Sequence, residues 1–292
     1  KNVPSMITEY NGHMFPTKMQ DNEERLAEHT KRHYEVVNAI AIDNHIAGGT
    51  GWCAFDYHTH YDFGSGDRIC YHGVYDMFRN PKFASTVYSS QMDTDKKIIL
   101  EPITIYARGE RAIGGITPLM ISTNCDYVEV YFKDIMIAKE YPATNKYQGL
   151  KHPPIIINIE QNIPGVSSMN WEDLKVIGYI NGKAEIERKY LKNPTFKELQ
   201  IFSDDKEINS INEGSAWDST RITIKAADSW GNRLPYINEA INIEVKGAGE
   251  LIGNDNPVLE GGYYSFWVKT NTKKGIIKIT VSNKRVESKS VE

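Results

Sequence analysis

From about Asp93 onward, the sequence alternates between apolar and polar residues with a period of two. This period is typical of strands that bury one face. The alternation occurs in two sets, each about 100 residues long, which is the size of an immunoglobulin-like domain. The sequence therefore predicts two β-sandwiches, with a joint near Asn193-Pro194. The apolar positions are Val128, Val130, Phe132, Ile155, Ile157 and Ile159 in the first set, and Ile222, Ile224, Ile241, Ile243, Val245, Phe266, Val268, Ile277, Ile279 and Val281 in the second.

A hairpin is the strongest local signal in this region. Asn181-Gly182 separates the strand Leu174–Ile180 from the strand Ala184–Glu187. Asn-Gly favours a type I′ turn, because both residues tolerate the positive φ that this turn needs. Further turn signals lie at 230–232, 247–249 and 261–262. The Cys…Trp…Cys core of antibody domains is absent, so the prediction is limited to the general sandwich architecture.

Residues 1–91 differ in pattern, because they contain the only long helical period in the sequence. Asp21 is expected to cap this helix, with Glu24 completing a capping box, and the helix is expected to end near Ile42. Its apolar side comprises Leu26, Thr30, Tyr34, Val37 and Ala41.

Strand-like segments flank this helix. Met6-Ile7 precedes it, and Gly48–Phe55 follows it as an expected short, fully buried strand. A strand, a helix and a second strand form a βαβ unit, which implies a parallel sheet. A further helix is expected from near Tyr75 to Tyr88, with Pro81 in its first turn, where a missing N–H does no harm.

Composition excludes several classes of function. The 292 residues carry a formal net charge of −4, with 34 Lys and Arg against 38 Asp and Glu, so a nucleic-acid or anionic-membrane binder is not expected. No apolar run approaches the roughly 18–20 residues of a membrane-spanning helix. The three cysteines fit neither a disulfide framework nor a zinc pattern. No phosphate-binding loop or Gly-x-Ser-x-Gly turn is present, and no cofactor is expected.

Two candidate groups stand at the ends of the first strands. Glu9 ends the first strand and precedes Asn11-Gly12, and in a βα barrel such strand ends point into the active site. The alternative is a solvated carboxylate with no role. Trp52 could stack on the apolar face of a sugar, and Asp56 could accept hydrogen bonds from its hydroxyls. The alternative for Trp52 is core packing.

Two further clusters leave alternatives open. His58, His60 and His72, with Asp62 and Asp67 nearby, could form a metal site, since imidazole and carboxylate suit zinc. Because no second close-spaced ligand pair appears, polar residues lining a cleft are the better interpretation, and no metal is predicted. Three aromatic residues near the C-terminus could form a carbohydrate-binding patch, although strand core is the stronger interpretation: Tyr263, Tyr264 and Trp267.

Several motifs together resemble the last part of the catalytic barrel of family 2 glycoside hydrolases, in particular the β-galactosidase group. They are Thr8-Glu9-Tyr10-Asn11-Gly12-His13-Met14-Phe15-Pro16-Thr17-Lys18, Gly51-Trp52-Cys53-Ala54-Phe55-Asp56-Tyr57 and His72-Gly73-Val74-Tyr75-Asp76. The segment from Ile222 to Gly253 resembles the C-terminal immunoglobulin-like domains of the same enzymes. The resemblance covers nearly the whole chain and is weakest in the middle domain.

The resemblance implies roles for individual residues. Glu9 matches the catalytic nucleophile at the end of the seventh barrel strand, and Trp52 matches an aromatic platform at the end of the eighth. Asp56 lies in the same sugar-binding rim, while His13 and Lys18 fall in the matching loop and are candidate substrate contacts. The family's acid/base is a Glu after an Asn at the end of the fourth strand, and no Asn-Glu pair of this sequence lies in a matching place.

The implied fold is multidomain: the last two βα units of a (β/α)8 barrel (residues 1–91) and two immunoglobulin-like β-sandwich domains (92–192 and 193–292). The chain, which starts as if cut from a longer polypeptide, is expected to be part of a retaining β-galactosidase and inactive alone. The alternative is a non-catalytic module that binds carbohydrate or mediates subunit contacts. Expected partners are a carbohydrate substrate and upstream segments of the same barrel, with a second copy of the chain as a further candidate, but neither nucleic acid nor membrane.

Overall fold

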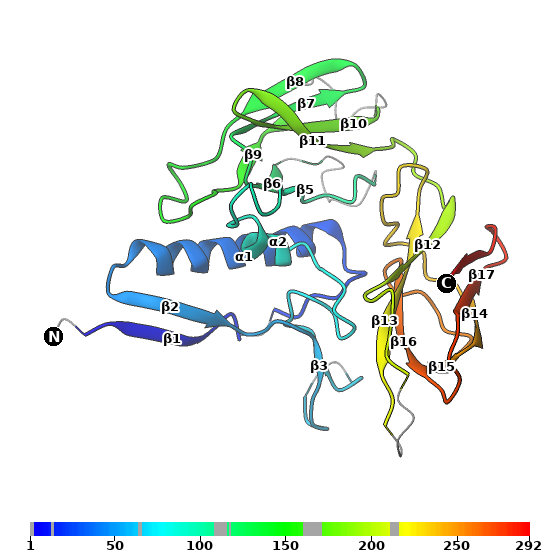
Figure 1. Ribbon diagram of the computed structural model, residues 1–292. Coiled ribbons are helices and arrows are strands. Elements are labelled where there is room, and N and C mark those ends of the chain that lie inside the picture. The colour runs from blue at the N-terminus through cyan, green and yellow to red at the C-terminus, as the bar shows by residue number, and fades with distance from the viewer. Residues whose placement is uncertain are drawn as a thin grey trace. The chain divides into compact units, whose positions relative to one another are not determined.

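The computed structural model describes residues 3–12, 15–63, 66–107, 116, 118–159, 171–210 and 216–292. The chain divides into two compact units, residues 1–193 and 194–292, and Figure 1 labels most of their helices and strands. The first unit contains the helices α1 (Glu23–Ile42) and α2 (Ser85–Ser89) and the strands β1 (Ser5–Tyr10), β2 (Ile46–Gly51), β3 (Tyr57–His58), β4 (Ile69–Cys70), β5 (Leu100–Pro102), β6 (Leu119–Thr123), β7 (Tyr127–Phe132), β8 (Ile135–Glu140), β9 (Ile155–Ile157), β10 (Leu174–Ile180) and β11 (Lys183–Tyr190). The second contains β12 (Glu198–Ser203), β13 (Ser219–Ala227), β14 (Asn242–Gly247), β15 (Gly249–Ile252), β16 (Tyr263–Thr270), β17 (Ile277–Ser282) and β18 (Lys289–Val291).

The predicted βαβ unit is confirmed, because β1 and β2 pair in parallel with α1 between them in the chain. The glycines of β2 make this packing possible. A Cβ at Gly49 would lie 2.8 Å from Ile40 Cδ1, and one at Gly51 would lie 3.0 Å from the Tyr10 ring. The prediction that this strand is fully buried is wrong: every residue of β2 is exposed or half-buried. The physical reason is that β1 and β2 form a two-stranded sheet within the described residues, so part of their surface stays uncovered.

Asn22, not Asp21, is the N-cap of α1, which corrects the sequence prediction. Its Oδ1 accepts a hydrogen bond of 2.9 Å from the Arg25 N–H. Asp21 instead accepts a 2.7 Å bond from the Lys18 N–H, which closes the turn before the helix. The helix ends at Ile42 as predicted, and Tyr34 is fully buried. Ala41 is exposed, so the apolar stripe ends before the helix does.

The predicted helix from Tyr75 is wrong over its first half. Tyr75 instead forms β-bridges with Phe55 and Pro81, and α2 has only five residues. The cause is a turn centred on Asp76, whose Oδ1 accepts bonds from the N–H groups of Phe78 (2.8 Å) and Asn80 (2.7 Å). Such side-chain bonds to the backbone compete with helix formation.

Residues from β5 to β11 form two sheets, in the orders β11-β10-β7-β8 and β5-β6-β9. Their inward side chains form one apolar cluster that contains Val128, Val130, Ile155 and Ile157, as the alternation predicts. The β10–β11 hairpin is confirmed, since Asn181 and Gly182 both have positive φ, at 52° and 75°.

The β5-β6-β9 sheet packs against α1. At the start of the helix, Glu23 Oε2 accepts 2.8 Å bonds from the Thr104 hydroxyl and the Ile105 N–H. Halfway along, the Tyr34 hydroxyl donates a 2.9 Å bond to Ser122 Oγ. Near the end, the Gly149 N–H donates a 2.9 Å bond to Asn38 Oδ1. An apolar cluster lies between these polar contacts, formed by Tyr34, Val87, Ile103, Met120, Tyr147 and Leu150.

The second unit also contains two sheets, in the orders β12-β13-β16-β15 and β14-β17-β18. Its core contains the predicted apolar positions, including Ile222, Ile224, Phe266 and Val281. All pairs within these sheets are antiparallel, which fits a β-sandwich. Over the ranges that the structure describes, no helix is both long and apolar enough to span a membrane.

Candidate active site

Glu9 and Trp52 lie beside each other where the two parallel strands end. The Trp52 N–H donates a 2.7 Å hydrogen bond to the Tyr10 carbonyl, which places Trp52 directly across from the end of β1. A Cβ at Gly12 would lie 2.3 Å from Glu9 Oε1 and 3.6 Å from Trp52 Cβ. Both side chains are therefore close to one point, beside the α-carbon of Gly12. Both are solvent-exposed, the Trp52 side chain by 40%.

The neighbouring residue shows which way Glu9 faces. The Tyr10 ring packs on Gly49 and Gly51, and its hydroxyl lies 3.0 Å from the Tyr88 hydroxyl, which is 2.8 Å from His33 Nδ1 on α1. The pairing of β1 with β2 is irregular between Ile7 and Tyr10, and within this stretch Glu9 is exposed whereas Tyr10 is half-buried. The carboxylate is thus on a side of β1 that is open to solvent.

Tyr57 orients the indole of Trp52, a contact that the sequence did not reveal. The Trp52 Nε1–H donates a 3.2 Å hydrogen bond to the Tyr57 hydroxyl, and the two rings meet edge to face with centroids 6.0 Å apart. The Trp52–Cys53 peptide bond is cis. No local pattern marks the Trp-Tyr pair, because the contact depends on the turn between β2 and β3.

Asp56 is buried in an ion pair with Lys82, whose role sequence reasoning missed. Its Oδ1 lies 2.7 Å from Lys82 Nζ and accepts a 2.8 Å bond from the Gly73 N–H. The side chains of Lys82 and Asp56 are 0% and 3% exposed. Burial raises the pKa of Asp56 to about 6, against the opposing effect of the Lys82 ammonium. This burial argues against the direct sugar contact that the resemblance implies for Asp56.

Lys18 is held by two residues of the segment around β4, Asp67 and Tyr71. Its Nζ lies 3.5 Å from Asp67 Oδ2 and 4.4 Å from the centre of the Tyr71 ring, and the Tyr71 hydroxyl donates a 2.7 Å bond to the same carboxylate. Lys18 is half-buried, so it is a fixed positive charge in the loop after β1 rather than a free side chain. His13, the other candidate in this loop, lies outside the described residues.

The histidine cluster does not assemble into one site. His58 and His60 are exposed, whereas His72 is buried at 5% exposure. Within the described part of the chain, no three His, Cys, Asp or Glu side chains are arranged to hold a metal ion. All three cysteines, which the structure describes, are free thiols. Burial raises the pKa of Cys53 to about 12, so it is not a thiolate nucleophile near neutral pH.

The three aromatic residues near the C-terminus do not share one surface. In β16, Tyr264 pairs with Ile224 and packs against the core cluster of the second unit. Tyr263 and Trp267 pair with Lys225 and Arg221 on the opposite face. The hypothesis of a single carbohydrate patch from all three is therefore wrong, because adjacent strand residues point to opposite faces.

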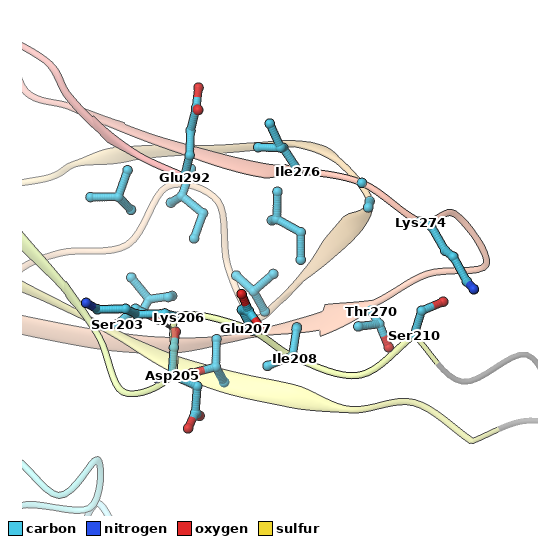
Figure 2. A pocket seen from close by; sticks show the side chains of 18 of the residues that line it. Ser203, Asp205, Lys206, Glu207, Ile208, Ser210, Thr270, Lys274, Ile276 and Glu292 are labelled. Carbon is cyan, nitrogen blue, oxygen red and sulfur yellow. Dashed lines mark hydrogen bonds between the residues drawn. The ribbon is translucent and has the colours of Figure 1, made fainter.

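The second unit has a cleft of about 640 Å³, shown in Figure 2. Its wall contains apolar side chains such as Ile222, Val268 and Ile279, and charged residues such as Lys206 and Glu207 also line it. None of the described residues that line the cleft is aromatic. Stacking on the face of a sugar ring needs an aromatic side chain, so the described lining of this cleft offers no stacking platform for a sugar.

Comparison with known proteins shows which family the chain resembles. Residues 203–292 match the family model described as glycoside hydrolase family 2 C-terminal domain 5. The structure is similar to a β-glycosidase from Bacteroides vulgatus, with a TM-score of 0.68 at 18% identity, over 88% of this chain and 32% of that one. At this identity, the similarity shows only that the two proteins share a fold.

Two curated relatives are more specific. A β-galactosidase of Thermoanaerobacterium thermosulfurigenes is 51% identical over 89% of this chain and 36% of its own length. A β-galactosidase of Rhizobium meliloti is 37% identical over 90% of this chain and 35% of its own. The resemblance to family 2 glycoside hydrolases is therefore confirmed. The chain spans about a third of the length of these relatives.

Proposed function

We propose that this chain is the part of a retaining β-galactosidase that contains the catalytic nucleophile, Glu9. The observation that carries the proposal is the meeting of Glu9 Oε1 and Trp52 at Gly12, where two parallel strands end. The names of the curated relatives support galactose as the sugar. In this proposal, residues 1–91 are the last two βα units of a (β/α)8 barrel, and the open face of the β1-β2 sheet is the barrel interior.

The reaction follows from the position of the carboxylate. Glu9 attacks the anomeric carbon of a terminal β-linked galactose, and the bond from that carbon to the leaving oxygen breaks. A second carboxylic acid protonates the leaving oxygen and then removes a proton from the water that hydrolyses the glycosyl-enzyme. Trp52 stacks on the apolar face of the sugar and excludes water from the reacting bond. Tyr57 holds the indole in that orientation.

The second carboxyl group must lie about 5–5.5 Å from the nucleophile in a retaining enzyme. Asp56 is a poor candidate, because its Oδ1 is bonded to Lys82 and Gly73. We therefore propose that another part of the longer protein supplies the acid/base and the remaining barrel strands. Without the acid/base, about 10²–10⁴-fold of the rate is lost, so the 292-residue chain alone is expected to be inactive.

A 2-deoxy-2-fluorogalactoside tests this proposal in the longer protein. Such a compound forms the glycosyl-enzyme but hydrolyses slowly, so mass spectrometry of the digested protein should find the label on Glu9. Glu9→Gln should abolish both labelling and turnover of nitrophenyl β-galactoside. Glu35→Gln is the matched control, because Glu35 is a surface carboxylate of α1, 48% exposed and paired with Lys31. A label on another residue, or normal turnover by Glu9→Gln, would refute the role of Glu9.

The same assay addresses the sugar. Turnover of nitrophenyl β-galactoside should exceed that of the matching β-glucuronide, since the proposal names galactose. The alternative of a purely carbohydrate-binding module has lost its main support, because Tyr264 faces the core. Assembly with a second copy of the chain stays a prediction, and size-exclusion chromatography with light scattering would test it.

A further inference from the structure

Four separate segments of the first unit meet at one buried ion pair, formed by Asp56 and Lys82. Asp56 lies in the loop after β2, and its Oδ1 accepts bonds from Lys82 Nζ (2.7 Å) and from the Gly73 N–H (2.8 Å). Lys82 Nζ also donates a 2.6 Å bond to the Thr17 carbonyl, in the loop after β1. Thr17 is fully buried. These contacts therefore link the loop after β1 to the loop after β2. We call them the clamp, and its residues are Asp56, Lys82, Gly73 and Thr17.

Backbone hydrogen bonds fasten the clamp to the Trp52 loop. The Val74 N–H donates to the Cys53 carbonyl (3.1 Å), and the Asp56 N–H donates to the Tyr75 carbonyl (3.0 Å). A Cβ at Gly73 would lie 2.3 Å from the backbone nitrogen of Asp56, so only glycine allows this close approach. The segment between Trp52 and Asp56 has little freedom to shift independently of the clamp.

We propose that Asp56 and Lys82 are positioning residues that set the placement of Trp52 relative to Glu9. The inference rests on the proposed function of Glu9. Lys82 bonds directly to the loop that follows Glu9, through Thr17, and to the loop that follows Trp52, through Asp56. Both side chains are buried, so they act on the reaction only through the two groups that they hold in place.

The alternative is that the pair serves stability alone. The two roles separate when both charges are removed together. Lys82→Met leaves a buried carboxylate without its partner, which destabilises the fold as well as releasing Thr17. Asp56→Asn combined with Lys82→Met leaves no unpaired buried charge, and the amide oxygen introduced at position 56 can still accept the Gly73 bond. The double variant should therefore recover stability while the link to Thr17 stays broken.

The experiment measures kcat, KM and thermal unfolding of the longer protein, at a temperature where circular dichroism shows each variant folded. A misplacement of about 1 Å can cost about 10²-fold in rate. The double variant should keep wild-type folding and lose kcat by about that factor, with a smaller change in KM. Lys151→Met is the matched control, because Lys151 forms an exposed pair with Asp93 and should leave kcat unchanged.

A stable double variant with wild-type kcat would overturn the inference and leave a stability role. A double variant that folds at no temperature would also overturn it, because the pair would then be required for folding itself. Glu9→Gln is assayed alongside to separate the two proposals. If Glu9→Gln is inactive while the double variant has normal kcat, only the positioning role fails. If Glu9→Gln is active, the proposed function itself fails.

Discussion

Replacing Lys82 by methionine should loosen the segment around Asp56 far more than an equivalent change at the surface. Both side chains of the Lys82–Asp56 pair are almost fully buried, at 0% and 3% exposure. Removing one partner of a buried pair typically costs about 3–5 kcal/mol, because the other charge stays buried without compensation. The exposed pair Lys151–Asp93, at 55% and 54%, should cost about 0–1 kcal/mol when Lys151 is replaced by methionine.

Hydrogen exchange of the intact protein, followed by mass spectrometry, measures this difference locally. The reporters are the backbone N–H groups of Gly73 and Lys82, which donate to Asp56 Oδ1 and to the Val74 carbonyl. Each 1.4 kcal/mol is a factor of ten in the opening equilibrium, so Lys82→Met should lower their protection by about 10²–10⁴-fold. Equal protection in Lys82→Met and Lys151→Met would refute the reasoning.

The effect should also depend on pH with a known sign. Burial raises the pKa of Asp56 from 3.8 to about 6, so the folded state keeps a proton that the unfolded state has lost between these values. The contribution of Asp56 to the free energy of unfolding therefore falls as the pH rises from 3.8 to about 6, and it then levels off. Without Lys82 the folded pKa rises further, and the fall continues above pH 6 at about 1.4 kcal/mol per unit. Between pH 6 and 7.5, the free energy of unfolding of Lys82→Met should fall by up to about 2 kcal/mol more than that of the wild type. Lys151→Met should show no such difference from the wild type.

Two further substitutions test the local structure. Gly73→Ala should lower the free energy of unfolding of the first unit by about 1–3 kcal/mol or more, because its Cβ would lie 2.4 Å or less from three backbone atoms of other residues. Denaturant unfolding measures this loss. An unchanged unfolding midpoint would show that the segments around Gly73 and Asp56 can separate without cost. Asn22→Ala should cost about 1 kcal/mol by removing the N-cap of α1, while Asn22→Asp should preserve it. Equal losses in both Asn22 variants would mean that the cap bond does not stabilise the helix.

Local patterns in the sequence predicted the elements that local physics determines. The Asn181-Gly182 turn, the alternation in β7 and the parallel βαβ unit all depend on contacts between neighbouring residues or on simple connection rules. The same patterns failed where a side chain had more than one possible use. Asp21 and Asn22 are both good caps, and the choice between them depends on the bond from Lys18 to Asp21.

In the candidate site, too, some features could be predicted from the sequence and others could not. Glu9 and Trp52 could be placed at one edge, because parallel strands end together. The burial of Asp56 could not be predicted, because its partner Lys82 is 26 positions away in the chain, and the intervening loop has no regular period. Tyr264 illustrates a third limit: an alternating strand assigns its residues to two faces, but the sequence alone does not say which face is inside.

The contacts along α1 have a consequence for engineering. Glu23, Tyr34 and Asn38 bond to Thr104, Ser122 and Gly149, which lie in the part of the chain after residue 91. Excising that part would remove these three polar contacts of the helix and expose the Tyr34 ring to water. The helix and the β-strands after residue 91 share one set of packing contacts. A chimera that replaces these strands with those of another protein will therefore fail to fold unless the side chains of α1 that contact them are redesigned to match.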